Sequence, residues 1–256
     1  MASEPTLPDR PRITLSVVSH RQGHLVRELL ATLETIRDES VEVVITLNVP
    51  ETLPFAAAQF GFPVRILENV RRRGFGANHN SAFRSARGEF LCVINPDIAF
   101  TVDPFAELVA VLRDGNTGVA APQVVTPLGA PEDNGRTFPT PAAILKKAFL
   151  PAPRRVHPDA ARVSHPDWVA GMFMLLSRKA FEAVGGFDER YFLYYEDVDL
   201  CARLRLHGYQ VAYCPRVSVV HAAQRRSHRN PYYFVWHLQS MVRFFCSDAY
   251  RRVRQA

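Results

Sequence analysis

Apolar runs and helical periods alternate along the first half of this 256-residue chain. Runs of β-branched and other apolar residues predict buried strands at residues 13–19, 41–47, 64–67, 90–94 and 119–125. Leucines at helical spacing predict a helix over 25–33, and residues 77–86 are helix-like. The pair Asp103-Pro104 is typical of a helix start. This alternation predicts an α/β fold with a mostly parallel central sheet and helices on both of its faces.

The middle of the chain is irregular. Residues 126–166 contain eight prolines and show little periodicity. We therefore expect a long loop or flap at 127–166, with a short helix near 142–149. Long irregular segments inside a compact domain tend to be functional or disordered.

Regular patterns return in the last third. We expect a strand at 169–176, a helix capped by Ser177 and stopped by Gly185-Gly186, and a helix at 196–206 followed by Gly208. Two short strands are expected at 211–214 and 218–221, and a final amphipathic helix with a basic end at 232–253, within a C-terminal segment 231–256. We interpret residues 1–256 as one domain with a flexible N-terminus at 1–12.

The arginine content bears on the class of ligand, and the cysteines bear on the cellular compartment. The net charge is +6, and all but three of the 31 basic residues are arginines. Arginine suits phosphate-bearing ligands, although codon bias explains the excess equally well. No secretory signal or membrane-spanning run is present, and the four cysteines form no CxxC pair, which fits a cytosolic protein. Nucleic-acid binding is disfavoured, because no such motif occurs and 25 acids dilute the positive charge.

Asn95-Pro96-Asp97 directly follows the predicted strand 90–94. Ligands of open α/β sheets bind beyond the carboxyl ends of strands, and a carboxylate there can bind a hard divalent cation. A plain Asx-Pro turn, common after any strand, is the favoured explanation on the tripeptide alone.

A glycine-containing basic segment, 69–77, lies between a predicted strand and a predicted helix. Gly74 and Gly76 would let backbone N–H groups approach an anion, and Arg73 could pair with phosphate. The segment is neither a Rossmann fingerprint nor a Walker A loop, since His79 replaces the third glycine and no Gly-Lys-Ser/Thr follows. A basic surface turn is the simpler alternative.

Glu196-Asp197 opens the predicted helix 196–206, and His221 closes the last predicted strand. An acidic pair at a helix start is ordinary capping, but the same helix dipole would keep a carboxylate ionised as a general base. A lone histidine is more often structural. His221 acquires a role only if it meets Asp97 in space, which spacing alone does not show.

Taken in order, these segments resemble family 2 glycosyltransferases of the GT-A fold, and among them the rhamnosyltransferase-like members. The strongest likeness runs through residues 167–171, 185–189, 195–200 and 219–221, and upstream through Asn69, 74–76, Asn80 and 95–97. The resemblance extends over about residues 13–245. The combination is specific, although each part alone is not.

The resemblance implies roles for individual residues. Asp97 matches the last acid of a DxD-type metal motif, and His221 the histidine that completes metal or pyrophosphate binding. Asp197 matches the catalytic base and Glu196 its partner. Acceptor-site positions correspond to Trp168, Gly171 and Tyr195. Donor-site positions correspond to Ser19, Asn48, Arg73, Gly74, Gly76, Asn80, Asn95 and Asp97. Asn48 replaces an acid that reads the base, and Asn95 replaces the first acid of the metal motif.

The implied activity is inverting sugar transfer that depends on Mg²⁺ or Mn²⁺. The donor would be a nucleotide-diphosphate sugar, with dTDP-L-rhamnose as one candidate, and the acceptor a hydroxyl of a glycan or polyprenyl-linked glycan. We expect a cytoplasmic location. The basic end of the last helix, Arg243 to Arg254, could contact anionic membrane at the inner face of the plasma membrane, but a solvated helix face is the simpler explanation. Two alternatives stay open: a nucleotidyltransferase, and a degenerate module that binds sugar nucleotides without catalysis.

Overall fold

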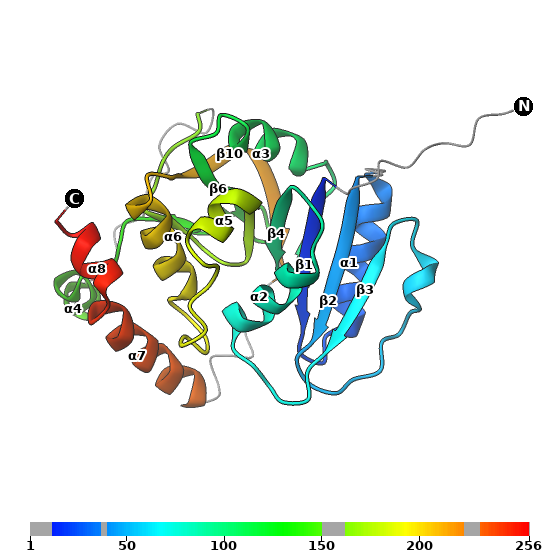
Figure 1. Cartoon of the computed structure of the whole chain (residues 1–256), viewed down its shortest axis with the longest axis horizontal. Helices are drawn as coiled ribbons and strands as arrows, with labels where there is room; N and C mark the ends of the chain where they lie inside the picture. The colour runs from blue at the N-terminus through cyan, green and yellow to red at the C-terminus, as the bar shows by residue number, and fades with distance from the viewer. Residues whose placement is uncertain (1–11, 37–39, 150–161, 223–230, 256) are drawn as a thin grey trace, which may run out of the picture.

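A computed structural model describes residues 12–36, 40–149, 162–222 and 231–255. Its main sheet has eight strands in the order β3-β2-β1-β4-β9-β6-β10-β5, with β9 and β5 antiparallel to their neighbours (Figure 1). The strands are β1 (Ile13–Ser19), β2 (Val41–Leu47), β3 (Val64–Glu68), β4 (Phe90–Ile94), β5 (Ile98–Ala99), β6 (Thr117–Val125), β9 (Phe173–Ser177) and β10 (Gln210–His221). A separate two-stranded sheet joins β7 (Gly135–Arg136) to β8 (Trp168–Val169).

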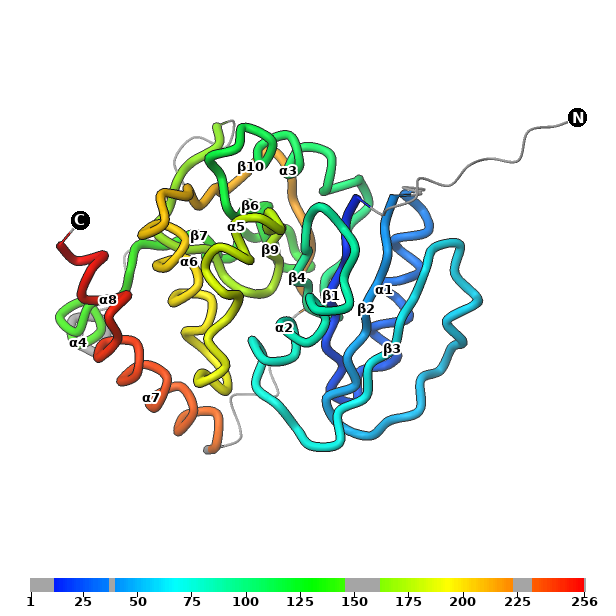
Figure 2. The backbone as a smooth tube through the Cα atoms, viewed as in Figure 1, coloured from blue at the N-terminus to red at the C-terminus, as the bar shows by residue number. Residues whose placement is uncertain are grey.

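Helices cover both faces of the main sheet (Figure 2). The helices are α1 (Gly23–Thr35), α2 (Phe75–Ser85), α3 (Phe105–Leu112), α4 (Pro141–Phe149), α5 (Arg178–Ala183), α6 (Glu196–Leu206), α7 (Pro231–Phe245) and α8 (Asp248–Val253), with a 3₁₀ turn η1 (Ala57–Gln59). One hydrophobic cluster packs α1 and α3 against the sheet, and a second packs α5, α6 and part of α7 against the other face. The predicted α/β class and mostly parallel sheet are confirmed.

Most predicted elements occur where the pattern placed them. The strands at 13–19, 41–47 and 90–94 and the helix at 196–206 match residue for residue. Asp103 accepts a hydrogen bond from the N–H of Phe105 at the start of α3, as a capping acid should. Gly185 and Gly186 adopt φ values of +74° and +72° after α5, which explains why glycines stop that helix. Ser177 stands at the N-cap of α5, but its side chain makes no capping hydrogen bond.

Three predicted elements need correction. The strand expected at 169–176 is two strands, β8 and β9, because the chain passes around Gly171 from the two-stranded sheet into the main sheet. The two strands expected at 211–214 and 218–221 are one strand, β10, whose pairing with β6 shifts between Cys214 and Ser218. The final helix breaks after Phe245, where Ser247 caps α8 by accepting a hydrogen bond from the N–H of Tyr250.

The expected flap contains more structure than its prolines indicate. It carries β7, which ties it to β8, and α4, which lies one residue earlier than expected. The rest of the flap at 150–161 and the N-terminus through residue 11 lie outside the described residues. Within the described ranges, no helix combines the length and the apolar character that crossing a bilayer requires.

Candidate active site

Asp97 and His221 meet although 124 positions of sequence separate them. β5 begins directly after Asp97 and pairs antiparallel with the end of β10, so that Ile98 stands opposite His221. The N–H of Ala222 donates to the carbonyl of Asp97 at 3.0 Å. Nε2 of His221 consequently lies 3.4 Å from Oδ1 of Asp97. The structure therefore brings together the two predicted metal ligands.

A third residue, Glu132, orients the histidine, and the sequence patterns did not single it out. Nδ1 of His221 lies 3.0 Å from Oε2 of Glu132, which comes from the turn between β6 and β7. Burial alone would lower the pKa of His221, but the carboxylates of Asp97 and Glu132 outweigh it and raise this pKa to about 9. With Nδ1 occupied by Glu132, Nε2 is the ring nitrogen directed at Asp97.

This pair fits a divalent cation. Oδ1 of Asp97 is buried, and in the described part of the chain it has no hydrogen-bond partner beyond its ion pair with the His221 ring at 3.4 Å. A cation that replaced the proton on Nε2 would therefore find both atoms directed at it. A carboxylate behind the far ring nitrogen is the usual support of a metal-binding histidine. No cluster of three or more acid, His or Cys side chains suited to a metal occurs among the described residues. Two protein ligands suit a cation that keeps water and substrate phosphate as its other ligands.

Glu196 and Asp197 open α6 from a strained turn. Tyr194 and Tyr195 precede them with φ values of +69° and +65°, which are costly for residues with side chains, at about 1–3 kcal/mol each. Glu196 is buried, and its Oε2 has no hydrogen-bond partner in the described structure. Burial, reinforced by the neighbouring Asp197, raises the pKa of Glu196 well above its ordinary value. Burial and the charge of Asp197 thus both favour the protonated form of Glu196.

Asp197 is positioned by backbone donors. The N–H of Gly171 donates to Oδ2 at 2.9 Å, and the N–H of Val198 donates to Oδ1 at 2.8 Å. Burial raises the pKa of Asp197, while these two N–H groups and the guanidinium of Arg136 oppose the rise. The environment is thus less favourable to ionisation than the helix dipole alone suggested. The two N–H donors stabilise the ionised form of Asp197, whereas Oε2 of Glu196 has no donor in the described part of the chain.

Trp168 and Arg136 stand beside this carboxylate on the small sheet. The two residues pair across β7 and β8, and the guanidinium of Arg136 lies 5.2 Å from the centre of the Trp168 ring. Nε1 of Trp168 donates to the carbonyl of Thr137 at 3.0 Å, which fixes the indole. Arg136 was missed in the sequence because it lies inside the proline-rich segment, away from any recognisable motif.

The two clusters are joined through consecutive residues. The N–H of Asn95, two positions before Asp97, donates to the carbonyl of Met172 at 2.9 Å. The residue before Met172 is Gly171, the donor to Asp197. A Cβ on Gly171 would lie 3.3 Å from the Phe75 ring and 3.6 Å from Cβ of Asp197. The segment between β8 and β9 therefore fixes the acidic pair relative to the metal pair.

The Asn48 side chain forms hydrogen bonds to the glycine-containing basic segment 69–77, called the basic loop below. Its Oδ1 accepts from the N–H of Arg73 at 2.8 Å and from Nδ2 of Asn69 at 2.9 Å, and its Nδ2 donates to the carbonyl of Arg73 at 2.9 Å. The Arg73 side chain forms an ion pair with Glu189 at 2.9 Å. These contacts connect the ends of β2 and β3 to the loop, which accounts for both asparagines structurally.

Gly74 and Gly76 have a packing reason that the sequence did not reveal. A Cβ on Gly74 would lie 2.8 Å from the carbonyl oxygens of Tyr191 and Phe192, and one on Gly76 would lie 2.6 Å from Cβ of Phe187. The N–H of Phe75 already donates to the carbonyl of Phe192 at 2.9 Å. The glycines were expected to open a cradle for an anion, yet they close the loop against the chain's own segment ahead of α6.

Asn80 acts on the same segment from within α2. Its Oδ1 accepts from the N–H of Phe187 at 2.9 Å, and its Nδ2 donates to the carbonyl of Phe187 at 2.8 Å and to Glu189 at 3.1 Å. Only an amide side chain can both donate to and accept from the backbone of Phe187 in this way, which explains the asparagine at position 80. Any contact of Asn80 with a donor stays a prediction.

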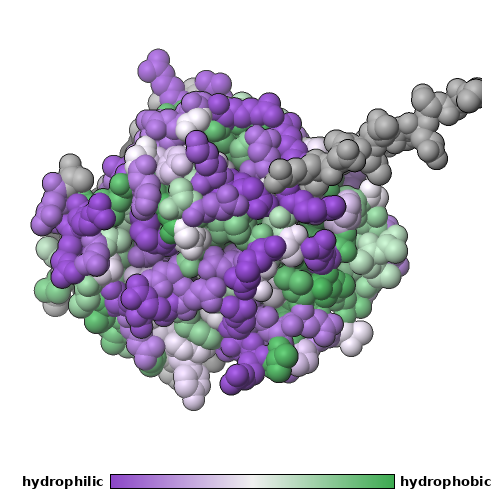
Figure 3. All heavy atoms as spheres, in the orientation of Figure 1, coloured by the Kyte–Doolittle hydropathy of each residue, from purple (hydrophilic) through white to green (hydrophobic). Residues whose placement is uncertain are grey.

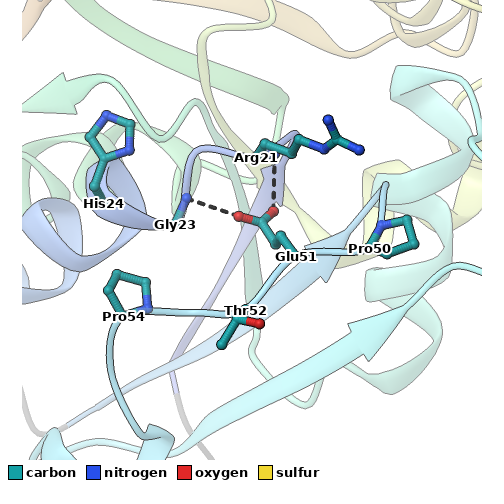
Figure 4. Close-up of a pocket in the computed structure, with 7 residues that line it drawn as sticks. All are labelled: Arg21, Gly23, His24, Pro50, Glu51, Thr52 and Pro54. Carbon is teal, nitrogen blue, oxygen red and sulfur yellow. Dashed lines mark hydrogen bonds between the residues drawn. The ribbon is translucent and has the colours of Figure 1, made fainter.

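An open pocket of about 460 Å³ lies where β1 and β2 end (Figure 4). Ser19, which ends β1 two residues before the lining residue Arg21, accepts a hydrogen bond from the N–H of Gln22. The carboxylate of Glu51 accepts from the N–H groups of Arg21 and Gly23, both at 3.1 Å, and so caps α1 from outside the helix. The family resemblance implies an acid near the end of β2, where this chain has Asn48. Glu51, three residues further on, is the acid that the structure shows at this pocket.

Comparison with known proteins places the chain in a family. The family model described as glycosyltransferase like family 2 matches residues 11–241, and the chain belongs to this family. It is similar to "Rhamnosyltransferase WbbL" of Escherichia coli K12, with 27% identity over 91% of this chain and 92% of the relative. It is 30% identical to the "N-acetylglucosaminyl-diphospho-decaprenol L-rhamnosyltransferase" of Mycobacterium tuberculosis H37Rv, over 84% of this chain and 77% of the relative. The protein is therefore a glycosyltransferase, and its resemblance to rhamnosyltransferase-like members is confirmed.

Solved structures confirm the GT-A fold. A structure of GalNAc-T7 with UDP, GalNAc and Mn²⁺ superposes with a TM-score of 0.63 at 17% identity, covering 93% of this chain and 48% of the other. The mannosyltransferase PcManGT from Pyrobaculum calidifontis, in complex with GDP-Man and Mn²⁺, gives 0.62 at 21% identity, covering 94% and 66%. The chain thus spans about half to two thirds of these proteins.

Proposed function

We propose that this glycosyltransferase moves a sugar from a nucleotide-diphosphate donor to a hydroxyl of a glycan or lipid-linked glycan, with inversion at the anomeric carbon. The observation that supports the proposal most is the link through Gly171 and Met172 between Asp197 and the Asp97–His221 pair. A general base and a diphosphate site must lie on opposite sides of the reacting sugar. The segment Gly171-Met172 holds the general base and the diphosphate site at a fixed separation, as such a reaction requires.

Asp197 serves as the general base in this proposal. Its carboxylate takes the proton of the acceptor hydroxyl while that oxygen attacks the anomeric carbon, and the bond from that carbon to the diphosphate breaks. The N–H groups of Gly171 and Val198 hold the carboxylate in place, and Glu196 keeps its own proton beside it. A single displacement of this kind inverts the configuration. Positioned bases contribute about 10²–10⁴-fold.

Asp97 and His221 would hold Mg²⁺ or Mn²⁺, with Glu132 orienting the histidine. When bound, the cation supplies a charge that offsets the negative charge developing on the leaving diphosphate. The fit rests on the buried Oδ1 of Asp97, and the structures of GalNAc-T7 and PcManGT were both obtained with Mn²⁺.

The pocket at the ends of β1 and β2 is the candidate site for the nucleoside, with Glu51 in its lining and Ser19 in the turn that leads from β1 to Arg21. Trp168, Gly171 and Tyr195 border the candidate acceptor side, where Arg136 adds a positive charge. L-Rhamnose is the first sugar to test, because two relatives are named as rhamnosyltransferases. A lipid-linked acceptor is suggested by the decaprenol named for the mycobacterial relative.

A nucleotide-sugar screen tests this proposal. The full chain is incubated with Mg²⁺ or Mn²⁺ and dTDP-L-rhamnose, GDP-mannose or UDP-N-acetylglucosamine, with polyprenyl-diphosphate-linked N-acetylglucosamine as acceptor. We expect release of a nucleoside diphosphate and a glycosylated product whose anomeric proton shows inversion. Release of pyrophosphate would instead indicate nucleotidyl transfer. Donor binding without turnover under any condition would indicate a non-catalytic module.

A further inference from the structure

α7 is apolar on two opposite faces. Its inner face packs on the protein: Phe244 is fully buried, and the Trp236 ring lies 4.7 Å from that of Phe192. Oγ of Ser240 donates to the carbonyl of Leu193 at 2.8 Å. These contacts fix the rotation of the helix about its own axis. The opposite face of α7 is thereby held toward solvent.

That outer face carries four apolar side chains, which we call the α7 stripe. At about 100° per residue, Phe234, Val235, Leu238 and Val242 fall on one side of the helix. Their exposed fractions are 72%, 44%, 45% and 52%. In Figure 3, green surface runs along the lower left edge, where Figure 1 places α7. Contiguous apolar side chains on an exposed helix face mark a surface that binds a protein or a membrane, so the stripe calls for a partner.

The stripe ends in a basic region. Arg243 in α7 and Arg251, Arg252 and Arg254 in and after α8 are all exposed. Asp248 is the one acid within 231–255, so arginines outnumber acids there by four to one. Arginines next to an apolar helix face match the two layers of an anionic bilayer surface, acyl chains below and headgroups above.

We propose that the α7 stripe docks this protein on an anionic phospholipid membrane, with the arginines of α8 at the headgroups. This occupant gives both the stripe and the arginines a partner. A second copy of the chain would cover the apolar side chains alone. The inference rests on the surface itself and holds whichever sugar and acceptor the enzyme uses.

Docking there would bring the candidate active site close to the membrane surface. The inner face of α7 contacts Arg72 of the basic loop, whose guanidinium lies 4.8 Å from the Trp236 ring centre. It also contacts Tyr195, the residue before the acidic pair, through His237 at 5.4 Å between ring centres. An acceptor that sits in the membrane would meet the enzyme on this side.

Vesicle flotation of the full chain tests the proposal. The probes are vesicles of phosphatidylcholine with phosphatidylglycerol and vesicles of phosphatidylcholine alone. The stripe variant is Phe234→Ser with Leu238→Ser, and its matched control is Val102→Ser with Leu128→Ser, which changes two apolar side chains exposed elsewhere at 75% and 95%. The charge variant is Arg252→Gln with Arg254→Gln. Circular dichroism and thermal midpoints verify that each variant is folded.

We expect the wild type and the control to float with the anionic vesicles, and the stripe variant to bind at least about tenfold less. Each arginine removed should weaken binding to anionic vesicles about fivefold and leave binding to phosphatidylcholine unchanged. Wild-type protein that stays unbound, or a stripe variant that floats like the wild type, overturns the proposal. So does a wild-type dimer that the stripe variant splits into monomers in light scattering, because a second copy is then the occupant.

Discussion

Oε2 of Glu132 lies 3.0 Å from Nδ1 of His221, on the side of the ring away from Asp97. The contact joins the turn between β6 and β7 to the end of β10. It sets the tautomer and the orientation of the imidazole, so that Nε2 faces the buried Oδ1 of Asp97. Glu132 is thus a positioning residue for the candidate metal ligand.

Glu132→Gln should weaken Mn²⁺ binding about 10–100-fold, because a neutral amide supports the imidazole less well than a carboxylate. Water-proton relaxation with Mn²⁺ alone measures the affinity without any turnover. Glu107→Gln is the control, since Glu107 is an acid paired with Arg216 at 3.8 Å outside the site. Equal Mn²⁺ affinity in wild type and Glu132→Gln would remove Glu132 from this role.

Asp197→Asn should fold, bind the donor and lose about 10²–10⁴-fold in turnover, because the amide keeps an acceptor for the Gly171 N–H but takes no proton. Product formation with an accepted donor and acceptor measures the loss, and donor affinity is measured separately by titration calorimetry. Asp103→Asn is the matched control, since asparagine caps a helix as well as aspartate does. Normal turnover by Asp197→Asn would show that another group is the base.

Gly74→Ala should lower the free energy of unfolding by about 1–3 kcal/mol, because the new methyl group would lie 2.8 Å from two backbone oxygens. Urea unfolding measures the change. Gly61→Ala is the control, since the nearest atom to its new methyl group would be Oε1 of Glu34, 4.0 Å away. If the glycine served only to admit an anion, the variant would instead keep its stability and lose donor affinity.

The elements predicted best are those set by local pattern. The strands β1, β2 and β4 and the helix α6 carry unbroken apolar runs or a clear helical period, and their bounds came out as expected. β5 and β7 have two residues each, too few to leave a period in the sequence. The sequence also did not predict the break between α7 and α8, because Ser247 lies within a stretch whose amphipathic pattern is continuous.

The site residues likewise fall into those that the sequence predicted and those that it did not. Asp97, His221 and Asp197 were predicted through a family pattern, and the structure places them where such roles are feasible. Glu132 and Arg136 act through pairing between distant strands, which no local spacing encodes. The asparagines and glycines of the donor segments were expected to face a ligand. In the described structure they contact other parts of the chain itself, backbone at Asn48, Asn80 and Gly74 and the Phe187 side chain at Gly76.

A buried histidine makes stability depend on pH. His79 is in α2 and points toward β1, with Nδ1 2.7 Å from Oγ of Ser16. Its Nε2 is buried and has no hydrogen-bond partner among the described residues. Burial lowers the pKa of His79 from 6.5 to about 3. The unfolded chain therefore takes up this proton first as pH falls, so the stability from neutral His79 is present above pH 6.5 and is lost progressively toward pH 3.

We expect His79 to account for about 2 kcal/mol of lost stability between pH 6.5 and about pH 5, since each pKa unit corresponds to about 1.4 kcal/mol. Urea unfolding of the wild type and of His79→Asn across this range measures it. Asparagine can still bond to Ser16 but does not titrate, so the difference between the two proteins should shrink on acidification as the wild type weakens. Because other groups titrate in both proteins, only this difference is diagnostic. A difference that stays constant with pH would show that His79 is as easily protonated in the fold as in the unfolded chain.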